Sequence, residues 1–252
     1  MKIAILAAGK SSRIYKEIKK NKCLVNIDGE TLINKSIKEI LKIRNIKEKD
    51  IYIVTGFKSH LIKKNVNKKF KRKNYIYNKD FQKKEMLHSM LLAMKKIDDD
   101  FICIYSDILF SYKILNKLIL FKKNLKIKIP ILKNWEKIWK YKDKSIYEDA
   151  EDLIFNNKTQ MVKSIGQKIK KLKPKYQYMG IIYFPKIEFK NILSLYLKLK
   201  DKSKMHLTKF LDKLIKNKIK IYGVPITSFW YEFDDFIDYK NFLKIKKSEK
   251  TI

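Results

Sequence analysis

Short apolar runs alternate with stretches of helically spaced apolar positions through the first 107 residues of the chain. The runs are brief and uninterrupted, as in strands buried on both faces, whereas the apolar positions between them recur at intervals of three and four residues. Strand and helix in alternation predict an α/β fold of the Rossmann-like, doubly wound type, with a mostly parallel sheet covered on both faces. The predicted strands are 2–7, 51–56, 75–77 and 101–107, and the predicted helices are 31–43, 58–70 and 85–97.

This alternation fails between residues 133 and 177, where aromatic and charged side chains mix without a period. We interpret 133–177 as an insert or flap over a site, and not as a second domain. A chain of 252 residues suits one domain with a modest insert, so residues 1–252 are predicted to form a single domain. Beyond the insert, strands are predicted at 178–185, 219–226 and 230–233, and helices at 205–217 and 235–246.

The composition adds a strongly basic balance, with 60 Lys plus Arg against 26 Asp plus Glu and a formal net charge of +34. Such a charge raises the alternative of a basic nucleic-acid-binding protein. However, only Arg13, Arg44 and Arg72 are arginines, the residue that nucleic-acid surfaces favour for bidentate contacts. The lysines are also spread over nearly every segment. We therefore expect attraction to small anionic ligands and no nucleic-acid partner.

The two cysteines and the N-terminal apolar run indicate the cellular compartment of the protein. Cys23 and Cys103 both lie in apolar surroundings, which suggests neither a disulfide framework nor a metal cluster. No N-terminal apolar segment reaches the roughly 18 residues of a membrane span, and Lys10 and Arg13 interrupt the first run too early for a signal peptide. We expect a cytoplasmic protein without a membrane partner, and the sequence leaves a homodimer open.

The first predicted strand ends in AAGKSSR, which places a glycine and a cluster of donors directly after a buried strand. A P-loop would need a second glycine at position 4, which is alanine, and a dinucleotide fingerprint would need three glycines where only Gly9 is present. An ordinary glycine-containing turn is the simplest alternative. We favour a loop that holds a nucleoside triphosphate, in which backbone N–H groups with Ser11, Ser12 and Arg13 supply donors and charge.

Acidic residues at two distant strand ends predict a metal site. Asp107 ends the strand FICIYSD at the carboxyl edge of the sheet, where open α/β sheets bind ligands, although it could instead cap the next helix. In WYEFDDF, alternation places Glu232 and Asp234 on one side of a short strand. Asp107 and Asp234 together could hold one Mg²⁺ with triphosphate oxygens. The acids that follow are interpreted as solvated residues of the first helical turn, namely Asp235 and Asp238.

These motifs, L-A-A-G-x-x-S-R followed by the lysine of NKCLVNIDGETLI, then IYSD and E-F-D, resemble the sugar-nucleotidyltransferase superfamily. The resemblance implies that Arg13 holds the leaving pyrophosphate and that Lys22 contacts the α-phosphate. The usual Gly-x-Gly is Gly9-Lys10-Ser11 here. The catalytic residues implied by the resemblance are Lys22, Arg13, Asp107 and Asp234, and the nucleotide-binding residues are Ala7, Ala8, Gly9, Lys10, Ser11, Ser12, Arg13, Lys22, Ser89 and Asp107.

Motifs in the middle of the chain indicate which branch of this superfamily the chain resembles. KEMLHSMLLA, IYSDILF, NWEKIW, YEDAED, IGQK and QYMGIIYF are similar, in that order, to the branch of phosphocholine cytidylyltransferases and of nucleotidyltransferase domains associated with phosphonate synthesis. This implies transfer of CMP from CTP, with Mg²⁺, to a small phosphorylated or phosphonylated acceptor such as phosphocholine, an aminoalkylphosphonate or a phosphorylated amino acid. A sugar-1-phosphate uridylyl- or thymidylyltransferase is the nearest alternative. Relatives often carry an asparagine where this chain has Glu85.

Aromatic and acidic residues of the insert suit an acceptor that carries an ammonium group. The other interpretation is that both tryptophans pack the flap and that the acidic run is solvated. The candidate acceptor-binding residues are Trp135, Trp139, Asp149, Tyr178 and Gly180.

Overall fold

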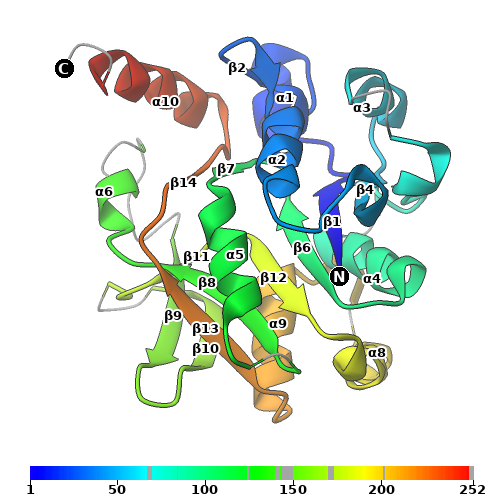
Figure 1. Cartoon of the computed structure of the whole chain (residues 1–252), viewed down its shortest axis with the longest axis vertical. Helices are drawn as coiled ribbons and strands as arrows, with labels where there is room; N and C mark the ends of the chain where they lie inside the picture. The colour runs from blue at the N-terminus through cyan, green and yellow to red at the C-terminus, as the bar shows by residue number, and fades with distance from the viewer. Residues whose placement is uncertain are drawn as a thin grey trace.

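The computed structural model of the chain is a sheet layered between helices (Figure 1). None of the helices in the described part of the chain combines the length and the apolar character of a membrane span. The structure describes residues 1–66, 70–83, 85–123, 125–139, 142, 150–169, 173–200 and 202–249, and within these the side chains of 12, 13 and 245–249 are not described.

The central sheet has ten strands, in the order β5-β4-β1-β6-β12-β8-β13-β10-β9, with β11 paired to β8. Parallel pairing joins β5 to β4, β4 to β1, β1 to β6 and β8 to β13. Antiparallel pairing places β12 between β6 and β8 and adds β10 and β9 at one edge. The strands are β1 (Lys2–Ala7), β4 (Ile51–Thr55), β5 (Tyr75–Tyr77), β6 (Phe101–Tyr105), β8 (Ile127–Leu132), β9 (Glu151–Asn156), β10 (Met161–Lys168), β11 (Gln177–Tyr178), β12 (Ile181–Phe184) and β13 (Ile221–Ile226).

Two hydrophobic layers form because successive residues of each strand point to opposite faces. In β1, Ile3 and Ile5 face one layer, and Ala4 and Leu6 face the other. Helices α2, α3 and α5 contribute to the first layer, and α4, α8 and α9 to the second (Figure 1). These helices are α2 (Leu32–Leu41), α3 (Ser59–Asn65), α4 (Met86–Ile97), α5 (Tyr112–Leu120), α8 (Phe189–Lys198) and α9 (Leu207–Lys216).

A smaller apolar cluster lies beside the carboxyl ends of the parallel strands. Helix α1 contacts helix α10, and a two-stranded sheet of β7 and β14 passes between this cluster and the main sheet. The elements of this region are α1 (Ser12–Ile18), β2 (Asn26–Ile27), β3 (Glu30–Thr31), β7 (Ile108–Phe110), α6 (Glu136–Trp139), β14 (Trp230–Glu232) and α10 (Phe236–Glu249).

The predicted α/β fold with a mostly parallel sheet is confirmed, and helices cover both faces. Within the predicted insert, residues 151–168 form the hairpin β9–β10, which pairs with β13 at the edge of the central sheet. Several of the described elements were not predicted, among them α5, β8 and α8. Both cysteines are buried and free, as their apolar surroundings indicated.

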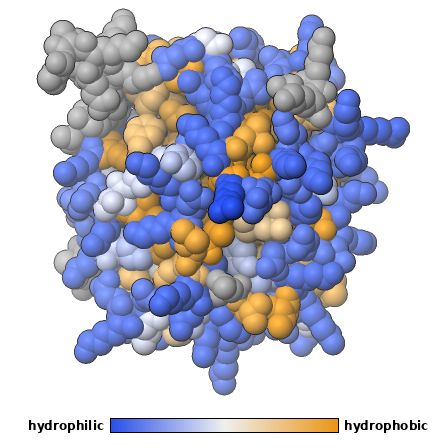
Figure 2. Space-filling view, in the orientation of Figure 1, coloured by the Kyte–Doolittle hydropathy of each residue, from blue (hydrophilic) through white to orange (hydrophobic). Residues whose placement is uncertain are grey.

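The surface is mostly hydrophilic on the face shown in Figure 2, with apolar residues in small separate areas. This view agrees with the spread of lysine along the sequence. The large apolar side chains that are exposed come from distant elements, as with Tyr77, Leu120 and Leu197.

Candidate active site

Three carboxylates meet just beyond the carboxyl end of β6. Asp107 follows this strand, and β7, which begins at the next residue, pairs antiparallel with β14 so that Ile108 lies opposite Glu232. The backbone N–H of Phe233 donates to the carbonyl of Asp107 at 3.0 Å, which fixes the two chain segments together. One carboxylate oxygen from each of Asp107, Glu232 and Asp234 lies within 4.8 Å of the other two. The structure thus brings Asp107 and Asp234 together and adds Glu232 to them.

This cluster has the donor set of a hard divalent cation. All three side chains offer oxygen, which Mg²⁺ prefers. Oδ1 of Asp107 is buried and has no hydrogen-bond partner among the described residues. A buried acceptor without a partner is costly, and a bound cation would satisfy it. The residues therefore fit a divalent metal ion.

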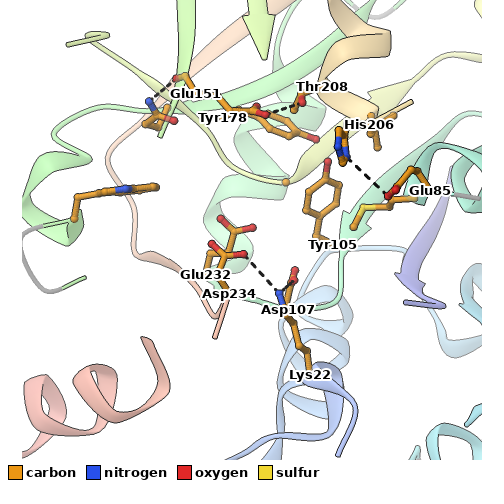
Figure 3. Close-up of a pocket in the computed structure, with 15 residues that line it drawn as sticks. Lys22, Glu85, Tyr105, Asp107, Glu151, Tyr178, His206, Thr208, Glu232 and Asp234 are labelled. Atoms are coloured by element: carbon orange, nitrogen blue, oxygen red, sulfur yellow. Dashed lines mark hydrogen bonds and ion pairs between the residues drawn. The ribbon is translucent and has the colours of Figure 1, made fainter. Parts of the chain in front are cut away.

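Lys22 lies against the cluster from the side of the N-terminal loop (Figure 3). Its Nζ is 3.1 Å from Oδ2 of Asp107 and 3.6 Å from Oδ1 of Asp234, and its side chain is 13% exposed. Burial opposes the charge of Lys22, but the neighbouring carboxylates outweigh burial, so the pKa of its ammonium group is raised. Lys22 is therefore cationic at neutral pH.

The carboxyl group of Glu232 is strongly perturbed by its surroundings. Burial raises the pKa of Glu232 well above its ordinary value, and the adjacent carboxylate of Asp234 raises it further. Closely spaced carboxylates cannot all remain ionised without a compensating positive charge. A bound cation would therefore stabilise the ionised form of the cluster.

The loop after β1 lines a cavity of about 710 Å³. The backbone N–H of Lys22 donates to Oγ of Ser11 at 3.0 Å, which ties this loop to the carboxylate cluster. Ser89 also lines the cavity, and its Oγ accepts a hydrogen bond from Nδ2 of Asn78 at 3.0 Å. Of the predicted nucleotide-binding residues, this cavity is lined by Ala8, Gly9, Lys10, Ser11 and Ser89.

Three predicted residues of the loop do not contribute a described side chain to the cavity wall. Ala7 is 4% exposed and packs in the core of the sheet. The side chains of Ser12 and Arg13 lie outside the described residues, so the predicted contact of Arg13 with pyrophosphate stays a prediction.

A second cavity of about 330 Å³ adjoins the first and shares Glu85, Met86 and His206 with it. Lys22 and the three carboxylates lie at one end, and Glu151 and Tyr178 lie at the other (Figure 3). The rings of Tyr105 and Tyr178 meet edge to face at 5.9 Å. Gly180, which has φ of +69°, packs against the Tyr105 ring, where an added Cβ would approach to 2.9 Å.

Glu151 is a partly buried residue of β9, and its carboxyl group lies in this cavity. Oε1 accepts a hydrogen bond from the hydroxyl of Thr208 at 2.9 Å. Burial raises the pKa of the Glu151 carboxyl, and the hydrogen bond from Thr208 opposes this shift. Glu151 belongs to the acidic run of the insert, but of that run only Asp149 was predicted to bind the acceptor.

Only some of the predicted acceptor-binding residues lie on the wall of the smaller cavity. Trp139, Tyr178 and Gly180 line the cavity. Trp135 does not, because it is 1% exposed in the core and its indole N–H donates to the carbonyl of Pro174 at 2.8 Å. Asp149 lies outside the described residues.

Asp238 differs from its interpretation as a solvated helix residue. Its side chain is fully buried, and Oδ2 accepts the backbone N–H groups of Asp234 at 2.7 Å and Asp235 at 3.3 Å. Asp238 therefore caps the turn between β14 and α10 from inside the protein. A buried lysine, Lys142, lies beside it and was not predicted as a site residue.

Comparisons with known proteins agree with this geometry. Residues 3–124 match the family described as the MobA-like NTP transferase domain. A comparison with curated protein sequences finds no match.

Solved structures extend the likeness to the whole chain. The inositol-1-phosphate CTP transferase from T. maritima has a TM-score of 0.73 and 19% identity, over 97% of this chain and 96% of that one. The CTP:phosphocholine cytidylyltransferase from Streptococcus pneumoniae has a TM-score of 0.68 and 19% identity, over 97% and 98%. A UDP-glucose pyrophosphorylase has a TM-score of 0.72 and 16% identity, over 98% of both chains. The chain therefore has the fold of these nucleotidyltransferases, and its residues 3–124 match the MobA-like NTP transferase domain.

Proposed function

We propose that the chain transfers CMP from CTP to a small phosphorylated or phosphonylated acceptor that carries an ammonium group, and releases pyrophosphate. The observation that carries this proposal is a pair of adjoining cavities with the carboxylates and Lys22 at one end of the smaller one. The larger cavity runs along the N-terminal loop, where backbone donors suit phosphates. The smaller cavity ends in a buried carboxylate and aromatic rings, which suit an ammonium group.

The proposed reaction is an in-line displacement at phosphorus. An anionic oxygen of the acceptor attacks the α-phosphorus of CTP, a P–O bond to the acceptor forms, and the bond from the α-phosphorus to the bridging oxygen breaks. Pyrophosphate leaves with the electron pair of that bond. The acceptor oxygen is already anionic at neutral pH, so the reaction needs no protein nucleophile. The protein contributes orientation and compensation of charge.

Each charged residue has a role in this proposal. Lys22 neutralises the α-phosphoryl group as negative charge shifts during the displacement, since its ammonium is fixed at the end of the cavity. Arg13 is assigned to the departing pyrophosphate, on the strength of the sequence resemblance alone. Asp107, Glu232 and Asp234 would hold Mg²⁺, which neutralises phosphate charge and orients the reacting groups when bound.

The choice of CTP rests on the sequence resemblance and is supported by two similar structures whose proteins are CTP-dependent by their descriptions. The alternative is a sugar-1-phosphate uridylyl- or thymidylyltransferase, and the similarity to a UDP-glucose pyrophosphorylase favours keeping it. A carboxylate at the far end of the acceptor cavity supports an ammonium-bearing acceptor over a neutral sugar, because a carboxylate complements an ammonium group better.

A coupled pyrophosphate assay tests the proposal. It crosses CTP, UTP, dTTP, ATP and GTP with phosphocholine, 2-aminoethylphosphonate, phosphoserine and glucose 1-phosphate, in the presence of Mg²⁺. We expect release with CTP and an ammonium-bearing acceptor. Release only with UTP or dTTP and glucose 1-phosphate would establish the alternative, and no release with any pair would contradict the proposal.

Glu151→Gln is expected to raise KM for the ammonium-bearing acceptor about tenfold or more, because a neutral amide loses the charge pairing with the ammonium. KM for the triphosphate should change less than about twofold, since Glu151 does not line the larger cavity. Asp152→Asn is the matched control, since this neighbouring acid points to the other face of β9 and does not line the acceptor cavity. An unchanged acceptor KM in Glu151→Gln would show that the ammonium lies elsewhere.

A further inference from the structure

A second lysine lies directly behind the carboxylate cluster. Nζ of Lys142 is 3.3 Å from Oδ2 of Asp234 and 3.7 Å from Oδ2 of Asp238, and its side chain is 0% exposed. Its backbone N–H donates to the carbonyl of Trp139 at 2.9 Å, and its ammonium lies 4.8 Å from the centre of the Trp139 ring. Contacts with Trp139 and Asp238 therefore hold Lys142 in place in addition to its contact with Asp234.

Asp238 anchors the ammonium of Lys142 on the side away from the cleft. This carboxylate is itself fixed, because Oδ2 accepts two backbone N–H groups and the side chain is buried. The carbonyl of Asp238 accepts a hydrogen bond from the hydroxyl of Tyr231 at 3.0 Å, which ties the first turn of α10 to β14. The position of Lys142 is thus set by a rigid support.

Asp234 consequently has an ammonium group beside each of its two oxygens. Lys22 lies 3.6 Å from Oδ1, and Lys142 lies 3.3 Å from Oδ2. Lys22 also contacts Asp107, so Oδ1 is on the side of the cluster and Oδ2 is on the side of the protein interior. Rotation of the Asp234 carboxylate would break one of these contacts. Hydrogen-bonded partners of this kind orient metal-ligating carboxylates in proteins.

The charge of Lys142 has a second effect. A buried positive charge a few ångströms from a divalent site opposes binding of the ion, and low local dielectric strengthens this effect. Lys142 does not line either cavity, so it is not placed to contact nucleotide or acceptor. It acts on the site from behind the carboxylates, through its contact with Asp234 and through its charge.

We infer that Lys142 is a positioning residue, which holds Oδ2 of Asp234 so that Oδ1 faces Lys22 and Asp107, and which lowers the affinity of the carboxylate cluster for a divalent cation. The inference rests on the proposed function, in which Asp107, Glu232 and Asp234 hold the ion. It goes beyond that proposal because it assigns the strength of ion binding to a residue outside the cleft.

Mn²⁺ binding to the nucleotide-free protein, followed by electron paramagnetic resonance, tests the inference without turnover. We expect Lys142→Met to bind Mn²⁺ about tenfold more tightly than the wild type, because a nearby positive charge is removed. We expect kcat to fall about tenfold, because Asp234 is no longer oriented, while KM for the triphosphate changes less than about threefold. A merely structural role for Lys142 would lower the melting temperature without tightening Mn²⁺ binding.

Lys142→Gln separates the two effects and guards against misfolding of the methionine variant. Its amide can still donate to Oδ2 of Asp234 but carries no charge. It should therefore bind Mn²⁺ more tightly, as Lys142→Met does, while recovering part of the lost kcat. Lys128→Met is the matched control for loss of a buried lysine, since Lys128 is 1% exposed and lines neither cavity. It should leave Mn²⁺ affinity and kcat unchanged.

Unchanged or weaker Mn²⁺ binding in both Lys142 variants would overturn the inference. Failure of the wild type to bind Mn²⁺ would instead contradict the metal site of the proposed function. The two failures are therefore distinguishable in the same titration.

Discussion

Replacing Lys22 by methionine is expected to lower kcat by about a hundredfold or more, with pyrophosphate release as the measurement. The ammonium group is preorganised at the end of the acceptor cavity, 3.1 Å from Asp107, and is mostly buried. A fixed charge in such a site stabilises negative charge that develops in the transition state, and loss of one such group typically costs two to three orders of magnitude. The effect should appear mainly in kcat, since the charge is needed when the bond to pyrophosphate breaks.

The stability of the same variant provides a second readout. Removing Lys22 leaves three carboxylates with less compensation, so the melting temperature without metal should fall. Mg²⁺ should restore the melting temperature, because it binds only the folded cluster, but it should not restore kcat. Lys20→Met, an exposed lysine two residues earlier, should behave as the wild type. Near-normal pyrophosphate release by Lys22→Met would contradict the assigned role.

Strands β1 and β6 were predictable because each is a continuous apolar run that is buried on both faces. Strand β8 was harder to recognise. Its sequence IKIPIL carries Lys128 and Pro130 inside a central strand, and both residue types argue against such a strand. Lys128 is accommodated because its ammonium lies 4.1 Å from the centre of the Tyr183 ring on the neighbouring strand β12.

The hairpin β9–β10 escaped prediction for a different reason. Its register shifts between Val162 and Ser164 and again between Ile165 and Gln167. Each such bulge adds a residue to one strand and inverts the order of inward and outward side chains after it. An alternation that is inverted twice within eight residues gives no steady period, so the segment reads as irregular.

The candidate site was predictable where function follows from position along a strand. Asp107 stands at a strand end, and Glu232 with Asp234 share a strand face, so the sequence alone indicated their chemistry. Lys142 and Asp238 were not recognisable, because their roles arise from the contact of Lys142 with the start of α10. Such contacts between elements remote in sequence have no local signal.

Asp107→Asn is expected to lower kcat by about a hundredfold or more, and to weaken divalent-cation binding. Oδ1 of Asp107 is buried without a partner among the described residues, and the acid is one of three that approach within 4.8 Å. An amide keeps the shape of the side chain but removes a negative charge and replaces one oxygen with a group that does not ligate Mg²⁺. Turnover across a Mg²⁺ titration measures the loss.

The melting temperature separates this effect from misfolding. In the wild type, Mg²⁺ should raise the melting temperature, since an ion that binds only the folded state stabilises it. In Asp107→Asn this rise should be largely lost, while the value without metal should be equal or higher, because mutual repulsion among the carboxylates falls. Asp98→Asn, an acid that is 71% exposed and paired with Lys186 on the surface, should retain both the rise and the turnover. If Asp107→Asn also retained both, the carboxylates would not form the ion site, and the charge of Lys22 alone would have to carry the chemistry of the cleft.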